Sequence, residues 1–120
     1  MQVSGVILNI NSPDPQRLLQ FYRDVVGIPA HPDENRESTL VAGGMELVFD
    51  SHSSVTGAAA QPERMLLNFF VDDLGTEQRR MESDGVTFVR SAGREYWGGV
   101  ISTFVDPDGN YAQIIEFTPR

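Results

Sequence analysis

Apolar and polar residues alternate in two short stretches of the chain, and each stretch precedes a helical pattern. The alternation in residues 6–11 and 65–71 predicts two strands. Helices are predicted over residues 14–27 and 73–85, each with an Asp at its start and a Gly at its end. The second pattern repeats the first after about 59 residues, which indicates two copies of one structural unit.

Further strand patterns follow each helix, so that each unit is predicted to have the order β-α-β-β-β. In the first unit, Pro29 and Pro32 interrupt the strand that should come directly after the helix, because proline cannot donate a hydrogen bond to a sheet. Residues 51–63 are small and polar without periodicity and predict a linker. The remaining predicted strands are residues 37–42, 45–50, 86–89, 100–105 and 111–117.

These patterns predict an α+β fold in which two tandem βαβββ modules form a single domain over residues 1–120. Module one covers about residues 1–50 and module two about residues 64–120. A duplicated unit of this kind cannot bury its apolar face alone, so the two modules should form one structure. A small-molecule site is expected at the seam between them.

Composition excludes several classes of function. The chain has no Cys, which rules out disulfides and thiolate chemistry, and its nine basic residues are all Arg. The net charge of −8 argues against a nucleic-acid partner and mildly favours a cationic ligand. No apolar run has the length of a membrane span, and the start of the chain lacks a signal-peptide pattern. A cytoplasmic location is therefore expected.

Two segments resemble a known family. Residues 14–27 (DPQRLLQFYRDVVG) are similar to the first helix of the vicinal oxygen chelate superfamily, and residues 106–111 (DPDGNY) to its last hairpin. The group Trp97-Gly98-Gly99 fits the same pattern. The superfamily includes glyoxalase I, bleomycin-resistance proteins, extradiol dioxygenases and fosfomycin-resistance enzymes. The resemblance implies two modules whose curved mixed sheets are flanked by helices and enclose a cleft. It also implies a homodimer.

The resemblance also implies four positions for metal ligands, usually His on the opening strands and Glu on the later ones. Spacing assigns these positions to Ile7, Glu46, Leu66 and Gln113. Two of them are aliphatic and cannot donate a lone pair, so neither a metal nor another cofactor is expected. A divalent metal remains the less favoured alternative. A slip of two residues in register would bring two Asn side chains there, which are poor zinc or iron ligands.

Strand parity predicts a set of side chains on the face away from the helices, where a ligand could bind. Purely structural roles remain alternatives for these side chains. The two Asn residues could form hydrogen bonds with the backbone, Glu46 could pair with an Arg, and Phe70 and Trp97 could be core or rim residues. The expected ligand-binding residues are Asn9, Glu46, Asn68, Phe70, Trp97, Tyr111 and Gln113.

The candidate catalytic residues are Glu46 and His52. Neither His31 nor His52 has a partner at metal-ligand spacing, so both are expected at the surface. If one acts, His52 is favoured, because the linker could fold over the cleft and supply a general base. Arg94 and Glu95 could clamp an anion or form a plain surface pair.

Three functions are consistent with these residues. The leading hypothesis is a metal-free protein that binds or sequesters a small organic ligand in its cleft, as in the bleomycin-resistance branch. The acidic net charge would suit a cationic ligand. The second is a glyoxalase- or dioxygenase-type lyase or oxidoreductase, with a metal held by Glu46, Gln113 and a histidine from His31 or His52. The third is a metal-free isomerase or lyase with Glu46 as base. Enzymatic activity is left open, and the expected partners are a small molecule and a second copy, with no nucleic acid or membrane.

Overall fold

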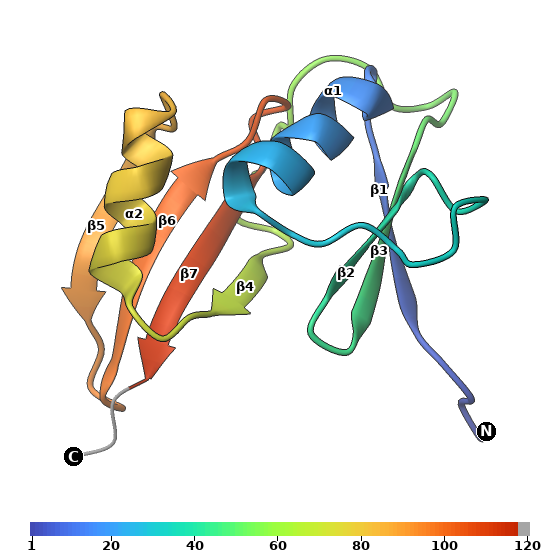
Figure 1. Ribbon diagram of the computed structural model, residues 1–120. Coiled ribbons are helices and arrows are strands. Elements are labelled where there is room, and N and C mark those ends of the chain that lie inside the picture. The colour runs from blue at the N-terminus through green and yellow to red at the C-terminus, as the bar shows by residue number, and fades with distance from the viewer. Residues whose placement is uncertain (118–120) are drawn as a thin grey trace. The chain divides into compact units, whose positions relative to one another are not determined.

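The computed structural model describes residues 1–117. The chain forms two compact units, and the boundary along the chain lies between Gly57 and Ala58. Each unit contains a mixed sheet with a helical segment on one face (Figure 1). The fold is therefore α+β, as predicted. Residues 51–63, predicted to be a linker, contain no helix or strand. None of the helices within residues 1–117 has the length and apolar character needed to cross a membrane.

The first unit has a three-stranded sheet in the order β1-β3-β2. Strand β1 runs parallel to β3, and β2 pairs with β3 in the antiparallel direction. The elements are β1 (Ile7–Asn11), α1 (Pro15–Gln20), the π-helical segment η1 (Phe21–Val26), β2 (Thr39–Ala42) and β3 (Met45–Asp50).

Local capping sets the limits of the first helical segment, as predicted. The carboxylate of Asp14 accepts a hydrogen bond of 3.2 Å from the N–H of Arg17. At the other end, the carbonyl of Tyr22 accepts the N–H groups of both Gly27, at 3.1 Å, and Ile28, at 2.9 Å. Gly27 has a φ of 95°, a left-handed conformation that glycine adopts without strain. The wider π-helical turn before Gly27 was not predicted.

The predicted strand directly after Gly27 is reduced to a single bridge between Ala30 and Leu40. The carbonyl of Pro29 still accepts a 2.8 Å hydrogen bond from the N–H of Val41. Neither Pro29 nor Pro32 has an N–H to extend the ladder, so the pairing stops there. The first unit therefore shows β-α-β-β with a remnant of the expected additional strand.

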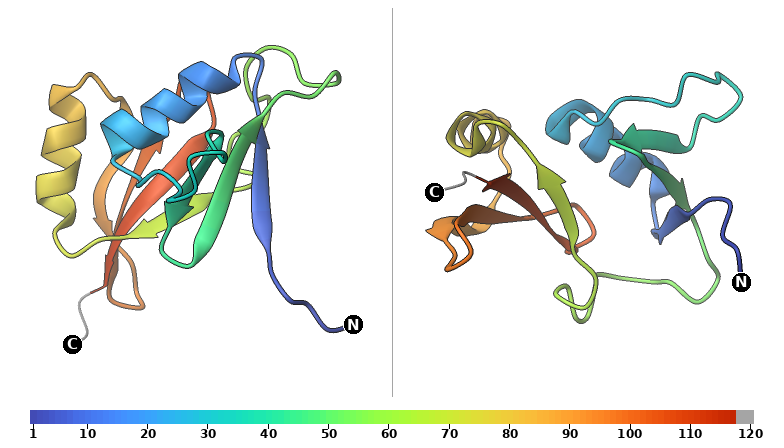
Figure 2. Two further views of the ribbon diagram at one scale, coloured as in Figure 1. Left: turned by 45° about the vertical axis from the view of Figure 1, so that its right-hand side comes forward. Right: turned by 90° about the horizontal axis from the view of Figure 1, so that it is seen from below.

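The second unit shows the complete β-α-β-β-β order, with a four-stranded sheet β4-β7-β6-β5 and helix α2 on one face (Figure 2). Strand β4 is parallel to β7, and the other pairs are antiparallel. Strand β4 is shorter than predicted, and β5 begins later and ends later. The elements are β4 (Leu67–Phe70), α2 (Leu74–Ser83), β5 (Phe88–Arg94), β6 (Gly99–Val105) and β7 (Tyr111–Phe117).

The core of the first unit forms between its helical segment and β3. Leu18, Leu19 and Tyr22 are buried on the helical side. Leu47 and Phe49 are buried on the sheet side, and the rings of Tyr22 and Phe49 lie 5.6 Å apart between centroids. Alternate residues of β3 thus point toward the helix, which confirms the predicted strand parity.

The core of the second unit forms in the same way, with one polar addition. Leu74 and Met81 of α2 are buried together with Phe104 of β6. Between them, the hydroxyl of Ser102 donates a 2.6 Å hydrogen bond to Oε1 of Gln78. The polar atoms of this pair are buried in the core, and the hydrogen bond between them compensates for their removal from water.

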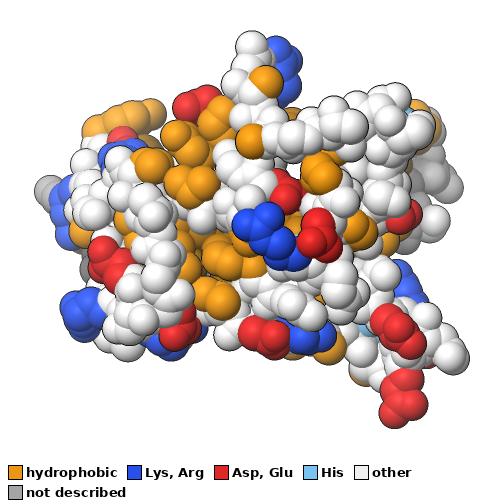
Figure 3. All heavy atoms as spheres, turned by 90° about the horizontal axis from the view of Figure 1, so that it is seen from above, with side chains coloured by type: hydrophobic (Ala, Val, Ile, Leu, Met, Phe, Trp, Pro, Cys, Tyr) orange, Lys and Arg blue, Asp and Glu red, His pale blue; other side chains and the backbone are white. Residues whose placement is uncertain are grey.

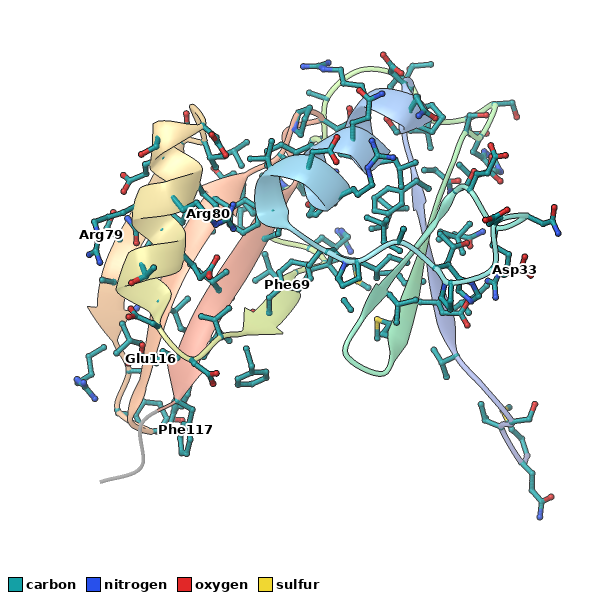
Figure 4. The ribbon with its side chains drawn as sticks, in the orientation of Figure 1. Asp33, Phe69, Arg79, Arg80, Glu116 and Phe117 are labelled. Carbon is teal, nitrogen blue, oxygen red and sulfur yellow. The ribbon has the colours of Figure 1, made fainter. Side chains whose placement is uncertain are left out.

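The start of α2 is held from two directions. Oδ1 of Asp73 accepts the N–H of Thr76 at 3.0 Å, the local cap that the sequence predicts. Oε1 of Glu116, at the end of β7, accepts the N–H of Leu74 at 2.9 Å (Figure 4). The second contact joins residues distant in sequence and fixes the helix to its own sheet.

Candidate functional site

Each sheet has one face covered by the helical segment of its own unit, and we call the other face the open face. In the first unit, the open face carries Ile7 and Asn9 of β1 beside Glu46 and Val48 of β3. Ile7 is 54% exposed, which is unusual for a large aliphatic side chain in a sheet. The open face of the second unit carries Asn68, Phe70, Thr103, Tyr111, Gln113 and Ile115.

Glu46 lies in a cluster of charged side chains within the first unit. Its Oε1 atom forms an ion pair with Nη2 of Arg36 and lies 3.5 Å from Nε2 of His31. The oxygen is buried, and its contact with the guanidinium lacks the alignment of a hydrogen bond. Nη1 of Arg36 is also 3.2 Å from Nε2 of His31. The carboxylate therefore has its charge balanced by an arginine of the same unit.

The two histidines lie in different surroundings. Nδ1 of His31 accepts the N–H of Asp33 at 3.0 Å, and Nε2 of the same ring faces both Glu46 and Arg36. His52 is exposed, and its Nδ1 accepts the N–H of Ser54 at 3.0 Å within its own turn. The structure thus places His31, rather than the favoured His52, beside Glu46.

The strand registers show which residues are neighbours at the expected ligand positions. Ile7 lies directly opposite Glu46, consistent with the spacing argument. In the second unit, Gln113 lies opposite Asn68. Leu66, to which spacing assigned this position, precedes the first residue of β4. The side chain that lies opposite Gln113 is therefore the amide of Asn68, two residues after Leu66.

A chain of hydrogen bonds crosses the open face of the second unit. The hydroxyl of Thr103 donates to Oε1 of Gln113 at 2.9 Å. Nε2 of Gln113 donates to Oδ1 of Asn68 at 2.6 Å. Nδ2 of Asn68 in turn donates to the carbonyl of Leu66 at 3.5 Å. Side chains thereby link three strands, and no pattern in the sequence indicated a role for Thr103.

The aromatic candidates of the second unit differ in exposure. Phe70 is 73% exposed, which contradicts a core position for its ring. Tyr111 is half-buried and lies opposite Val105. The ring of Trp97 stacks on Phe117 with centroids 6.1 Å apart and planes at 15°, so Trp97 lies at the end of the sheet.

The predicted contact between Arg94 and Glu95 is replaced by two others. The carboxylate of Glu95 forms an ion pair with Arg90. Nη1 of Arg94 donates to the carbonyl of Gly98 at 3.2 Å. Both arginines are thus engaged locally.

On the face drawn in Figure 3, acidic and basic side chains are interspersed and form no block of one sign.

The residues at the implied metal positions do not fit a divalent cation. Ile7 has no lone pair, and Glu46 is already paired with a guanidinium, whose positive charge opposes a metal. The carbonyl oxygen of Gln113 accepts the hydroxyl hydrogen of Thr103. Within residues 1–117, there is no group of three or more His, Asp or Glu side chains arranged to hold an ion.

One family model matches most of this chain. The family model described as Glyoxalase/Bleomycin resistance protein/Dioxygenase superfamily matches residues 6–114. A search among curated proteins gives no match.

Solved structures with the same fold cover nearly the whole chain. The antibiotic-binding protein TnmS3 from Streptomyces sp. CB03234 is 22% identical with a TM-score of 0.75, and the match covers 98% of this chain and 99% of that one. A family enzyme from Burkholderia phytofirmans PsJN is 21% identical with a TM-score of 0.74 over 93% and 97% of the two chains. A superfamily member from Sphaerobacter thermophilus DSM 20745 is 20% identical with a TM-score of 0.73 over 95% and 98%.

Proposed function

Because the chain belongs to the glyoxalase/bleomycin resistance protein/dioxygenase superfamily, we propose that it binds a small organic molecule without a metal ion. The observation that carries this proposal is the open face of the second unit. There, a chain of amide and hydroxyl groups lies beside the exposed ring of Phe70. Apolar surface with a few ordered polar groups is typical of small-molecule sites.

The absence of a metal from this proposal rests on the chemistry of the side chains. The aliphatic Ile7 next to an arginine-paired Glu46 offers no pair of ligands in the first unit. In the second unit, the neighbouring amides of Asn68 and Gln113 are hydrogen-bonded to each other. Neutral amides bind zinc and iron poorly.

Glu46 is a weak candidate for a general base in this structure. A base must reach the proton of the substrate, whereas the Oε1 atom of Glu46 is buried against the guanidinium of Arg36. Binding or sequestration is therefore favoured over isomerase or lyase chemistry. Similarity to TnmS3, which is described as an antibiotic-binding protein, supports the same choice.

The proposal is tested by ligand-linked stabilisation of the purified protein. A library of cationic antibiotics and neutral aromatic metabolites is screened by thermal shift, and hits are confirmed by calorimetry. We expect at least one class to bind with 1:1 stoichiometry, and Glu46→Gln to keep that binding within about threefold. Elemental analysis is expected to find no stoichiometric zinc, nickel, manganese or iron. A library without any hit, or a bound metal in stoichiometric amount, would contradict the proposal.

The homodimer and the cytoplasmic location belong to the same proposal. The resemblance supports a dimer, and a dimer can complete a binding site from two copies. Light scattering coupled to size exclusion should give twice the chain mass of 13.3 kDa. A monomer at all concentrations would remove the dimer from the proposal.

A further inference from the structure

We propose that Asn68 donates a hydrogen bond to a neutral acceptor oxygen of the ligand while the ring of Phe70 packs against a planar ring of the same molecule. The ligand class is thus a flat aromatic compound with a carbonyl oxygen. This inference rests on the proposed function and narrows it, because the net charge alone favours a cation.

The direction of the hydrogen-bond chain carries the argument. A backbone carbonyl can only accept, so the contact with the carbonyl of Leu66 identifies Nδ2 of Asn68 as the atom on that side. Oδ1 of Asn68 then faces Gln113 and accepts from its Nε2 atom. Oε1 of Gln113 consequently faces Thr103 and accepts its hydroxyl hydrogen. The backbone carbonyl of Leu66 therefore determines the orientation of both side-chain amides.

This orientation decides what the open face offers to a ligand. Each amide nitrogen carries two hydrogens and donates only one of them, to the Leu66 carbonyl for Asn68 and to Asn68 for Gln113. Among residues 1–117, neither nitrogen has a second acceptor. Asn68 is exposed, so its remaining N–H is accessible to a ligand. The group complementary to this N–H is an acceptor oxygen of the ligand.

Charge favours a neutral acceptor over a carboxylate. Arg90 lies opposite Thr103 and is the nearest cation by register, but Glu95 already pairs with it. The overall charge of −8 also disfavours an anion. A carbonyl oxygen needs a donor and no countercharge, which is what Asn68 provides.

The position of Phe70 adds the aromatic part of the ligand. Phe70 lies two residues after Asn68 on β4, so both side chains point to the open face about 6.6 Å apart along the strand. Its ring is 73% exposed. A molecule with a carbonyl on a fused ring system can reach both residues, because offset stacking of rings occurs over similar distances.

The test uses two probes with the same three-ring skeleton. Acridone is neutral and carries a carbonyl, whereas 9-aminoacridine is a cation with N–H donors. Fluorescence titration of the wild-type protein should show tighter binding of acridone. Asn68→Asp keeps the size of the side chain but removes its donors, so acridone should bind about tenfold more weakly and 9-aminoacridine more tightly.

The control is Asn35→Asp, which makes the same chemical change at an exposed position in the first unit. It should leave both affinities within about twofold. Phe70→Ala provides a second variant and should weaken both probes, because it removes the ring and leaves the polar chain. Thermal denaturation of each variant verifies folding.

The outcomes separate this inference from the proposed function. An unchanged acridone affinity in Asn68→Asp would overturn the role of Asn68. Wild-type protein that binds other library compounds but not acridone would overturn the ligand class and leave the binding function intact. If no library compound binds, both the function and the inference fail.

Discussion

The indole ring of Trp97 lies against Gly99 so closely that a Cβ atom at position 99 would be 1.9 Å from Cζ3 of the ring. The ring also stacks on Phe117 at the end of β7. Trp97 is the single tryptophan of the chain, so the tryptophan fluorescence comes from this ring alone. The absence of a side chain at Gly99 is thus a condition for the aromatic stack.

Replacement of Gly99 by Ala should displace the ring of Trp97 from Phe117. The added methyl overlaps the indole, so either the ring moves into solvent or the strand shifts, at a cost of about 1–3 kcal/mol. We expect a red-shifted emission maximum and a lower urea midpoint. Gly44→Ala is the matched control, because a Cβ there meets no atom within 4 Å. An emission maximum identical to wild type would show that the ring does not depend on Gly99.

Removal of the hydroxyl of Ser102 should destabilise the second unit. Its O–H group donates to the buried Oε1 of Gln78 at 2.6 Å, and its oxygen accepts the N–H of Ala92 at 2.8 Å. Ser102→Ala leaves a buried acceptor without its donor, which costs about 1–3 kcal/mol in urea unfolding. Ser83→Ala removes a hydroxyl from an exposed helical position and should cost less than about 0.5 kcal/mol. Equal costs for the two variants would contradict the role assigned to the buried pair.

The helix limits and the last hairpin could be predicted because each depends on local chemistry. The caps at Asp14 and Asp73 form within three residues of the carboxylate. The left-handed residue Gly27 ends the first helical segment for the same reason. In the last hairpin, Oδ1 of Asp106 accepts the N–H of Asp108 at 2.9 Å, which closes the predicted turn.

The composition of the site could be predicted only in part, because it depends on contacts distant in sequence. Strand parity placed Glu46 on the open face. The residues around Arg36 show no periodic pattern, so the sequence could not predict that Arg36 contacts Glu46. Parallel register is set by long-range pairing, so spacing from the helix cap selected Leu66 where Asn68 lies opposite Gln113. The resulting polar chain became visible only with the structure.

The stability of the second unit should depend on pH through Asp73. A hydrogen bond from the backbone N–H of Thr76 lowers the pKa of the Asp73 carboxyl in the folded state. Its contribution to stability is therefore present above the unfolded pKa of about 3.9 and is lost as the pH falls through the lower folded pKa. Asp73→Ser keeps a capping oxygen without a titrating group.

Melting temperatures of the wild type and Asp73→Ser are to be compared between about pH 6 and pH 2. The variant should lose less stability than the wild type over the acid end of this range. Asp72→Ser is the adjacent control and should follow the wild-type curve, because the cap bond comes from Asp73. Parallel curves for the wild type and Asp73→Ser would show that this carboxylate does not contribute in the expected way.

A metal site should appear in the first unit when two side chains are changed together. Ile7 lies opposite Glu46, and Nε2 of His31 lies 3.5 Å from the same carboxylate, while Arg36 supplies the opposing charge. Ile7→His adds a third donor and Arg36→Ala removes the cation, so the double variant should bind Zn²⁺ with 1:1 stoichiometry in calorimetry, about tenfold more tightly than either single variant. The Arg36→Ala variant serves as the control for charge removal alone. Equally tight binding by Ile7→His with Arg36 in place would refute the view that the guanidinium excludes a metal from Glu46.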